Sequence, residues 1–223
     1  MLPAAAYSIV QQVNERGDYS YCMCPGGFIV PAATANGKVV VSGMSPSKRN
    51  NAFANSGIVV EINIDRDIPK HEKFGALKGL EYQKDLERLA FAGGGKSQTA
   101  HAQRITNFVE VKLSVDLNPT SYQPGLKSSP LHSLLPKFIG SRLRKGFAAF
   151  RQKMHGYYTE EANIVGVESR TSSPVNIPRN ENLEHIEIKG LYPCGEVGGY
   201  AGGIVSAAMD GERCAEAASV GLN

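Results

Sequence analysis

The strongest constraint on this chain of 223 residues is a glycine-rich segment near its C-terminal end. A short apolar run, Leu191–Cys194, leads into the segment, and an alanine-rich stretch, roughly 201–218, follows it. The pattern predicts a strand, a tight turn and a helix, with glycines in between at Gly195, Gly198, Gly199, Gly202 and Gly203. Because glycine has no Cβ, a ligand or another stretch of backbone can lie close to the chain here.

Two interpretations of this turn stay open. One is a tightly packed strand–helix turn without a ligand, for which two glycines usually suffice. The other is a ligand-contacting turn, which the larger number of glycines favours. The carboxylate of Glu196 can accept hydrogen bonds from the hydroxyls of a sugar-like chain, and N–H groups at a helix start favour electron-rich atoms. We therefore predict ligand contact at the turn.

The rest of the chain predicts an α+β fold, with a mixed or antiparallel sheet and helices. Residues 1 to about 65 are rich in β-branched residues between Gly, Asn and Pro, which favours strands. Apolar residues at helical spacing predict helices around Tyr82–Ala90, Ala102–Val109 and Leu143–Met154, with a loop over 113–130. Later strands are expected at Ile164–Glu168, Ile186–Ile188 and Leu191–Cys194.

Composition excludes several classes of protein. The formal net charge of +3 is too mild to indicate nucleic acid or an anionic membrane as the main partner. No run approaches the roughly 20 apolar residues of a membrane-spanning helix, and the N-terminus lacks the pattern of a secretory signal. Four cysteines do not make a disulfide framework, which indicates a reducing compartment. We expect a cytoplasmic protein without a nucleic-acid or membrane partner.

The segment Leu191–Gly211 resembles the C-terminal flavin-binding motif of uncharacterised FAD-dependent dehydrogenases (NAD(FAD)-utilising dehydrogenases). These belong to the superfamily of two-domain flavoproteins of the glutathione-reductase type. The same resemblance runs through Tyr21–Gly27, continues to Val41–Ser45 and Arg49, and returns at Gly166–Pro174. It therefore covers essentially the whole chain in one order.

The resemblance implies that residues 1–161 form a substrate or cap subdomain and that 162–223 return to complete a Rossmann-like FAD-binding domain. It implies FAD as the cofactor, hydride or electron transfer on a small-molecule substrate, and NAD(P)H as an electron donor. Glu196 would contact the ribityl chain, although many relatives have Asp there. The implied cofactor contacts are Gly195, Glu196, Gly198, Gly199, Tyr200, Gly202, Gly203, Ile204, Arg170 and Thr171.

Flavoproteins of this type also need a strand, a G-x-G-x-x-G turn and a helix to hold the pyrophosphate. The sequence contains no such segment. We expect the chain to be the C-terminal portion of a longer oxidoreductase, with the N-terminal FAD-binding part of the same protein as its partner. Alone, it would bind FAD weakly and be inactive. The alternative is a stand-alone module, not an enzyme, that binds another ligand through the glycine turn.

Several other residues are weaker candidates. Cys22, Cys24, Arg49 and Asn55 are assigned to the substrate side, and the Cys-x-Cys spacing leaves a redox role open beside that of two reduced thiols. Arg170 and Thr171 follow an expected strand and suit either an anionic group or a plain strand end. No cysteine or histidine spacing indicates a metal site, and no side chain is indicated as the catalytic acid or base.

Overall fold

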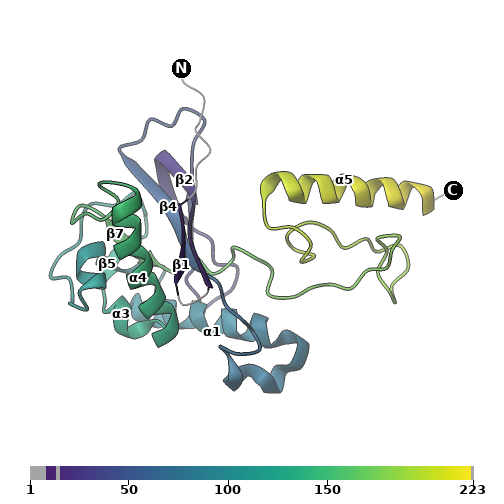
Figure 1. The fold of residues 1–223 in the computed structure, drawn as a ribbon, viewed down its shortest axis with the longest axis horizontal. Helices are drawn as coiled ribbons and strands as arrows, with labels where there is room; N and C mark the ends of the chain where they lie inside the picture. The colour runs from purple at the N-terminus through teal and green to yellow at the C-terminus, as the bar shows by residue number, and fades with distance from the viewer. Residues whose placement is uncertain (1–8, 14–15, 222–223) are drawn as a thin grey trace. The chain divides into compact units, whose positions relative to one another are not determined.

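The computed structural model describes residues 9–13 and 16–221 of the chain. Two compact units are present. The first unit comprises Met1–Ile62 with Lys84–Ser169, and the second unit comprises Asn63–Gln83 with Arg170–Asn223. Figure 1 labels most of their helices and strands. The predicted division at residue 161 concerns an intact flavoprotein, so it stays a prediction.

An antiparallel sheet around one long strand forms the start of the first unit. Strand β2 (Arg16–Pro31) pairs with β1 (Ile9–Val13) and β4 (Phe53–Val60) along its first part and with β3 (Val41–Met44) at its end. The register opposes Ile9 to Ser20. The β-rich character predicted for this region is confirmed.

A second, mixed sheet has β5 (Ala100–Arg104) at its centre. It runs parallel to β6 (Leu126–Ser128) and antiparallel to β7 (Asn163–Gly166). The helix expected over 102–109 was therefore half wrong, because only α2 (Ile105–Val109) is helical. Strand β5 lies between two strands and is buried along almost its whole length, but it contains none of the β-branched or aromatic residues that favour strands.

The helices of the first unit supply its core. Helix α4 (Lys137–Lys153) follows the short α3 (Leu131–Leu134) and buries Leu143, Phe147 and Phe150 as predicted. It contacts α2, α3 and the strands β1, β2 and β4. The Phe147 ring meets Phe108 of α2 edge-on, with 6.2 Å between ring centroids.

A buried ion pair fastens α4 to the antiparallel sheet. Nη2 of Arg142 lies 2.9 Å from Oδ1 of Asp18 in β2, and the guanidinium also donates to the carbonyl oxygens of Gly17 and Glu61. Burial raises the pKa of Asp18 to about 6, because lost hydration outweighs the attraction of Arg142. The pair connects a helix and a strand more than a hundred residues apart in sequence.

The second unit has little regular structure before its long helix. The 3-10 helix η1 (Pro69–Leu77) leads into α1 (Lys78–Gly93), within which the unit boundary falls, and α5 (Ile204–Gly221) ends the described chain. The strands expected at Ile186–Ile188 and Leu191–Cys194 are absent from the described residues. The backbone turns back on itself there, with the N–H of His185 donating to the carbonyl of Leu191, so no ladder forms.

The α+β class is confirmed by these helices and by the antiparallel and mixed sheets. In the described part of the chain, no helix combines the length and hydrophobicity needed to cross a membrane.

Candidate functional site

Three of the five clustered glycines are required by the turn itself. Gly195 and Gly199 have φ of +63° and +84°, a region that residues with a side chain rarely adopt. A Cβ on Gly198 would lie 2.9 Å from the backbone N and O of Cys194. The carbonyl of Gly195 accepts hydrogen bonds from the N–H groups of Tyr200 and Ala201. These glycines fold the turn, whatever else it does.

The other two glycines have no such internal reason. A Cβ on Gly202 would meet nothing within 4 Å, and one on Gly203 would meet only Oγ of Ser206 at 3.3 Å. Both are exposed, as are Glu196 and Ile204. The N–H of Gly203 donates to Oγ of Ser206, which caps the start of α5. Packing within the described chain therefore leaves the glycine at position 202 unexplained.

A buried ion pair that the sequence analysis missed holds the turn against α5. Arg179 donates from Nη2 to Oδ1 of Asp210 at 2.8 Å and from Nη1 to Oδ2 at 3.0 Å. Oδ2 of Asp210 also accepts from the N–H of Gly195 at 2.9 Å. These hydrogen bonds from Arg179 and Gly195 lower the pKa of Asp210 to about 2. The carboxylate thus joins three separate segments of the second unit.

The guanidinium of Arg179 organises further groups around it. Its Cζ lies 3.6 Å from the centroid of the Tyr200 ring, and Nη1 donates to the carbonyl of Pro193 and to Sγ of Cys214. The Tyr200 hydroxyl donates to the carbonyl of Ile177. Tyr200, a predicted cofactor contact, thus packs internally on Arg179. The signal that could have revealed this cluster is the i, i+4 spacing of Asp210 and Cys214, the two buried positions of α5.

The segment after Arg170 and Thr171 runs along the glycine turn. Oγ of Ser173 donates to the carbonyl of Val197, and the N–H of Ile177 donates to the carbonyl of Gly198. Arg170 and Thr171 are partly buried two to three residues upstream. The structure thus brings the chain that follows these two residues to the turn.

Helix α5 carries apolar side chains that the rest of the second unit does not cover. The exposed fractions are 90% for Ile204, 72% for Val205, 60% for Met209 and 75% for Val220. Val197 in the turn is 81% exposed. Isolated exposed apolar residues are ordinary on a protein surface, whereas these residues are concentrated on one helix and the turn before it.

In the first unit, Cys22 and Cys24 lie in a distorted part of β2. The register with β4 shifts between Tyr21 and Cys24 and again between Cys24 and Gly27, so a bulge lies on each side of Cys24. Cys22 is exposed with φ of +48°, and Cys24 is partly buried with its thiol donating to the carbonyl of Cys22 at 3.1 Å.

The two remaining substrate-side candidates surround the same bulges. Arg49 also has a positive φ, +47°, and a Cβ on Gly26 would lie 2.1 Å from its carbonyl oxygen. The Asn55 side chain donates to the carbonyl of Phe28 and fills the space beside Gly43, where a Cβ would lie 2.1 Å from its Oδ1. The structure thus brings together all four predicted residues, with Asn55 acting as internal support.

A shallow groove of about 440 Å³ lies beside this region. Its apolar walls include Phe28, Ile29 and Phe53, and its polar rim includes Thr120 and Gln123. The volume falls in the range of small-molecule sites, about 300–1,000 Å³. Among the residues that the structure describes, no three His, Cys, Asp or Glu side chains gather to hold a metal ion.

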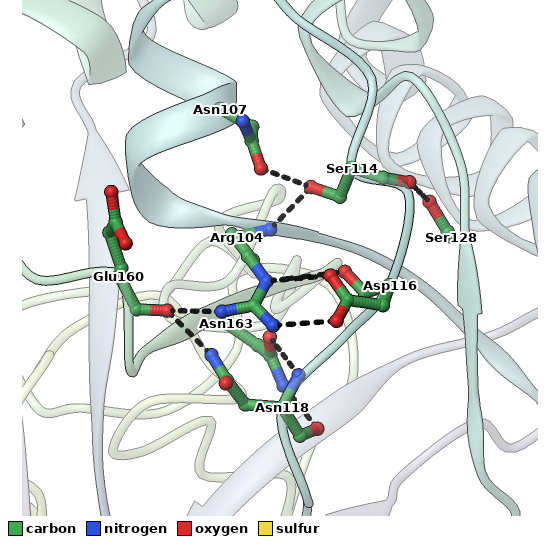
Figure 2. Close-up of polar contacts among 8 residues, drawn as sticks. All are labelled: Arg104, Asn107, Ser114, Asp116, Asn118, Ser128, Glu160 and Asn163. Carbon is green, nitrogen blue, oxygen red and sulfur yellow. Dashed lines mark hydrogen bonds and ion pairs between the residues drawn. The ribbon is translucent and has the colours of Figure 1, made fainter.

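A second polar cluster in the first unit connects separate segments of the chain and has a structural role (Figure 2). Arg104 donates from Nε and Nη2 to both carboxylate oxygens of Asp116 and from Nη1 to the carbonyl of Glu160. Asn118 donates to the same Glu160 carbonyl at 2.7 Å. These bonds tie the loop after α2 to β5 and to the chain entering β7. Because the guanidinium is engaged by the protein itself, the cluster does not resemble an anion site.

Comparisons with known proteins agree with the resemblance at the level of the family. Residues 1–171 match the family model described as "FAD-dependent protein, C-terminal domain-like". An "Uncharacterized protein" of Clostridium beijerinckii is 41% identical over 220 residues, which cover 96% of this chain and 40% of that relative. The chain thus spans about two fifths of the relative's length, and the glycine turn lies beyond the part that the family model matches. By the match over its first 171 residues, the chain belongs to the family of FAD-dependent protein C-terminal domains.

Proposed function

We propose that this chain is the C-terminal portion of an FAD-dependent oxidoreductase of the glutathione-reductase type, and that its second unit completes the flavin site. The observation that carries the proposal is the open backbone at Gly202 and Gly203, next to the exposed Glu196 and the start of α5. The family supports an FAD-related protein. The relative's greater length supports a further part of the same polypeptide as the partner.

In this proposal each group at the turn has a separate task. Glu196 accepts hydrogen bonds from ribityl hydroxyls, and the bare backbone of Gly202 and Gly203 admits the flat ring without steric conflict. FAD, when bound, supplies hydride or electron transfer. The N-terminus of α5, at Ile204, would stabilise the negative charge that a reduced flavin gathers at its N1/O2 edge. Arg179 and Asp210 hold the turn in this shape, and Arg170 and Thr171 complete the cofactor side.

The remaining assignments follow from the same proposal. The N-terminal part of the protein holds the pyrophosphate, and the exposed apolar residues of α5 pack against it. NAD(P)H is the proposed electron donor. The first unit, with the groove and the side chains of Arg49 and Cys24, contributes residues that contact a small-molecule substrate.

The test compares two substitutions in the longer protein. Gly202→Leu and Gly211→Leu both replace glycines around which the described chain leaves open space. We expect Gly202→Leu to lower the bound FAD per polypeptide at least about tenfold, whereas Gly211→Leu retains it. Visible flavin absorbance of the purified proteins measures this, and circular dichroism checks folding. Equal FAD content in both variants would contradict the proposal.

A second experiment separates the proposal from the stand-alone module. The chain of 223 residues is titrated with FAD while flavin fluorescence is followed. We expect no saturable tight binding, because the turn supplies only one side of the site. Saturable tight binding by this chain alone would favour an independent ligand-binding module.

A further inference from the structure

We propose that Cys22 and Cys24 form a thiol–disulfide couple that exchanges with low-molecular-weight disulfides such as glutathione disulfide. Cys22 is the attacking thiol and Cys24 the resolving thiol. The inference concerns the first unit alone and does not depend on the flavin site.

The two bulges of β2 bring the cysteines into a geometry that a regular strand does not offer. Residues two apart on a regular strand are separated by about 6.7 Å, near the upper limit of Cα separations for disulfides. A bulge bends the strand and re-aims the side chains next to it. Here Sγ of Cys24 turns back toward Cys22 and lies 3.1 Å from its carbonyl oxygen. The resolving sulfur thus already lies against the backbone of the neighbouring cysteine.

The backbone around the pair is strained. Cys22 and Arg49 are two of the five non-glycine residues with positive φ that the structure records in the described chain. Non-glycine residues in such conformations are unfavourable and cluster at functional sites. The loop carrying Arg49 packs so closely on Gly26 that no side chain fits there. The surrounding chain therefore maintains the strained bulge.

The exposure of each thiol fits its role. Cys22 is exposed and accessible to a tripeptide disulfide, whereas Cys24 is partly buried. Burial raises the pKa of the Cys24 thiol, with Arg49 acting in the opposite sense and Glu168 adding to the rise. A thiol with a raised pKa reacts poorly with an external disulfide. It still resolves a disulfide on its neighbour, because the second step is intramolecular.

The exchange balances in two steps. The Cys22 thiolate attacks one sulfur of glutathione disulfide, which forms a mixed disulfide and releases one glutathione thiolate. The Cys24 thiolate then attacks the Cys22 sulfur, which forms the Cys22–Cys24 disulfide and releases the second glutathione. The two protein thiols lose two electrons and two protons, and these appear in the two glutathione thiols.

The test uses the folded chain in glutathione buffers of increasing oxidised fraction, followed by acid quenching, alkylation and mass spectrometry. Trypsin releases 17–38, a peptide that contains Cys22 and Cys24 but neither of the other cysteines. In the wild type we expect this peptide to be two hydrogens lighter than the same peptide with both thiols reduced. We expect it to carry little glutathione adduct. In Cys24→Ser the adduct on Cys22 should accumulate at least about tenfold more, because nothing resolves it. In Cys22→Ser, Cys24 should remain mostly a thiol.

Exposed Cys194 serves as an internal control for simple glutathione addition. The proposal is overturned if the wild-type peptide stays a dithiol when Cys194 is modified. It is also overturned if the wild-type peptide accumulates the glutathione adduct instead of the Cys22–Cys24 disulfide. Because the wild type alone gives both of these results, the proposal stays testable even if a variant fails to fold.

Discussion

The two units of this chain differ in the interactions that stabilise each of them internally. Among the described residues, the buried aliphatic, aromatic and cysteine side chains belong to the first unit, apart from Ile68 and Cys214. The first unit also contains two sheets, and helices pack against the strands of both. The second unit instead depends on Arg179 and Asp210 and leaves the apolar residues of α5 exposed.

This contrast teaches that local order and a complete core are separate properties. Hydrophobic burial is the main favourable contribution to folding, and the second unit obtains little of it within the described residues. A buried ion pair fixes geometry but contributes weakly to stability, because desolvation offsets its attraction. Within the described residues, the second unit thus has an ordered turn held by polar contacts but little buried apolar surface.

The largest expected effect concerns the ion pair of the first unit. Arg142→Met leaves the Asp18 carboxylate buried without its partner, which should lower the free energy of unfolding by about 3–5 kcal/mol at neutral pH. Arg151→Met, on the exposed side of the same helix, should cost less than about 1 kcal/mol. Urea unfolding followed by far-UV circular dichroism measures both. Similar losses in the two variants would show that the buried pair does not fasten α4 to the sheet.

A smaller effect is expected from acid acting on His101, whose buried ring nitrogens have no hydrogen-bond partner among the described residues. Burial lowers the pKa of His101 from 6.5 to about 4. Between these values the unfolded chain binds a proton that the folded chain does not. The stability contributed by this residue should therefore fall by about 3 kcal/mol as the pH drops from 6.5 to 4.

Asp18 acts in the opposite sense over nearly the same range, because its pKa is raised in the folded state and folding gains a proton there. The two effects are separated by comparing His101→Leu with the wild type. The variant should gain about 3 kcal/mol relative to the wild type between pH 7 and pH 4. A difference between the proteins that does not change with pH would contradict the assignment to His101.

The smallest effect is expected in the second unit. Asp210→Asn removes the charge that Arg179 and the Gly195 N–H stabilise, and should cost about 2 kcal/mol locally. Amide exchange should accelerate in the glycine turn and in α5 but remain unchanged in the strands of the first unit. Glu212→Gln, an exposed neighbour on α5, is the matched control. If exchange in the first unit changed as well, the units would not be independent in stability.

The sequence predicted best what local pattern determines. The stripe of Leu143, Phe147 and Phe150 indicated α4, and the glycines with the alanine-rich stretch indicated the turn and α5. Strand β5 was missed because Ala100–Arg104 contains none of the β-branched or aromatic residues that indicate a strand. The i, i+4 spacing of Asp210 and Cys214 marked the inner face of α5, but no spacing identified Arg179, 31 residues from Asp210, as the partner. The strands expected near Ile186 and Leu191 require a partner strand, which local sequence does not specify.

The central claim is that the second unit is completed by a surface outside these 223 residues. Hydrogen–deuterium exchange of α5 tests it most directly, in this chain alone and in the longer protein with FAD added. We expect the α5 amides to become at least about 100-fold more protected in the longer protein, while the strands of the first unit keep their protection. Equal protection of α5 in both proteins would contradict the account.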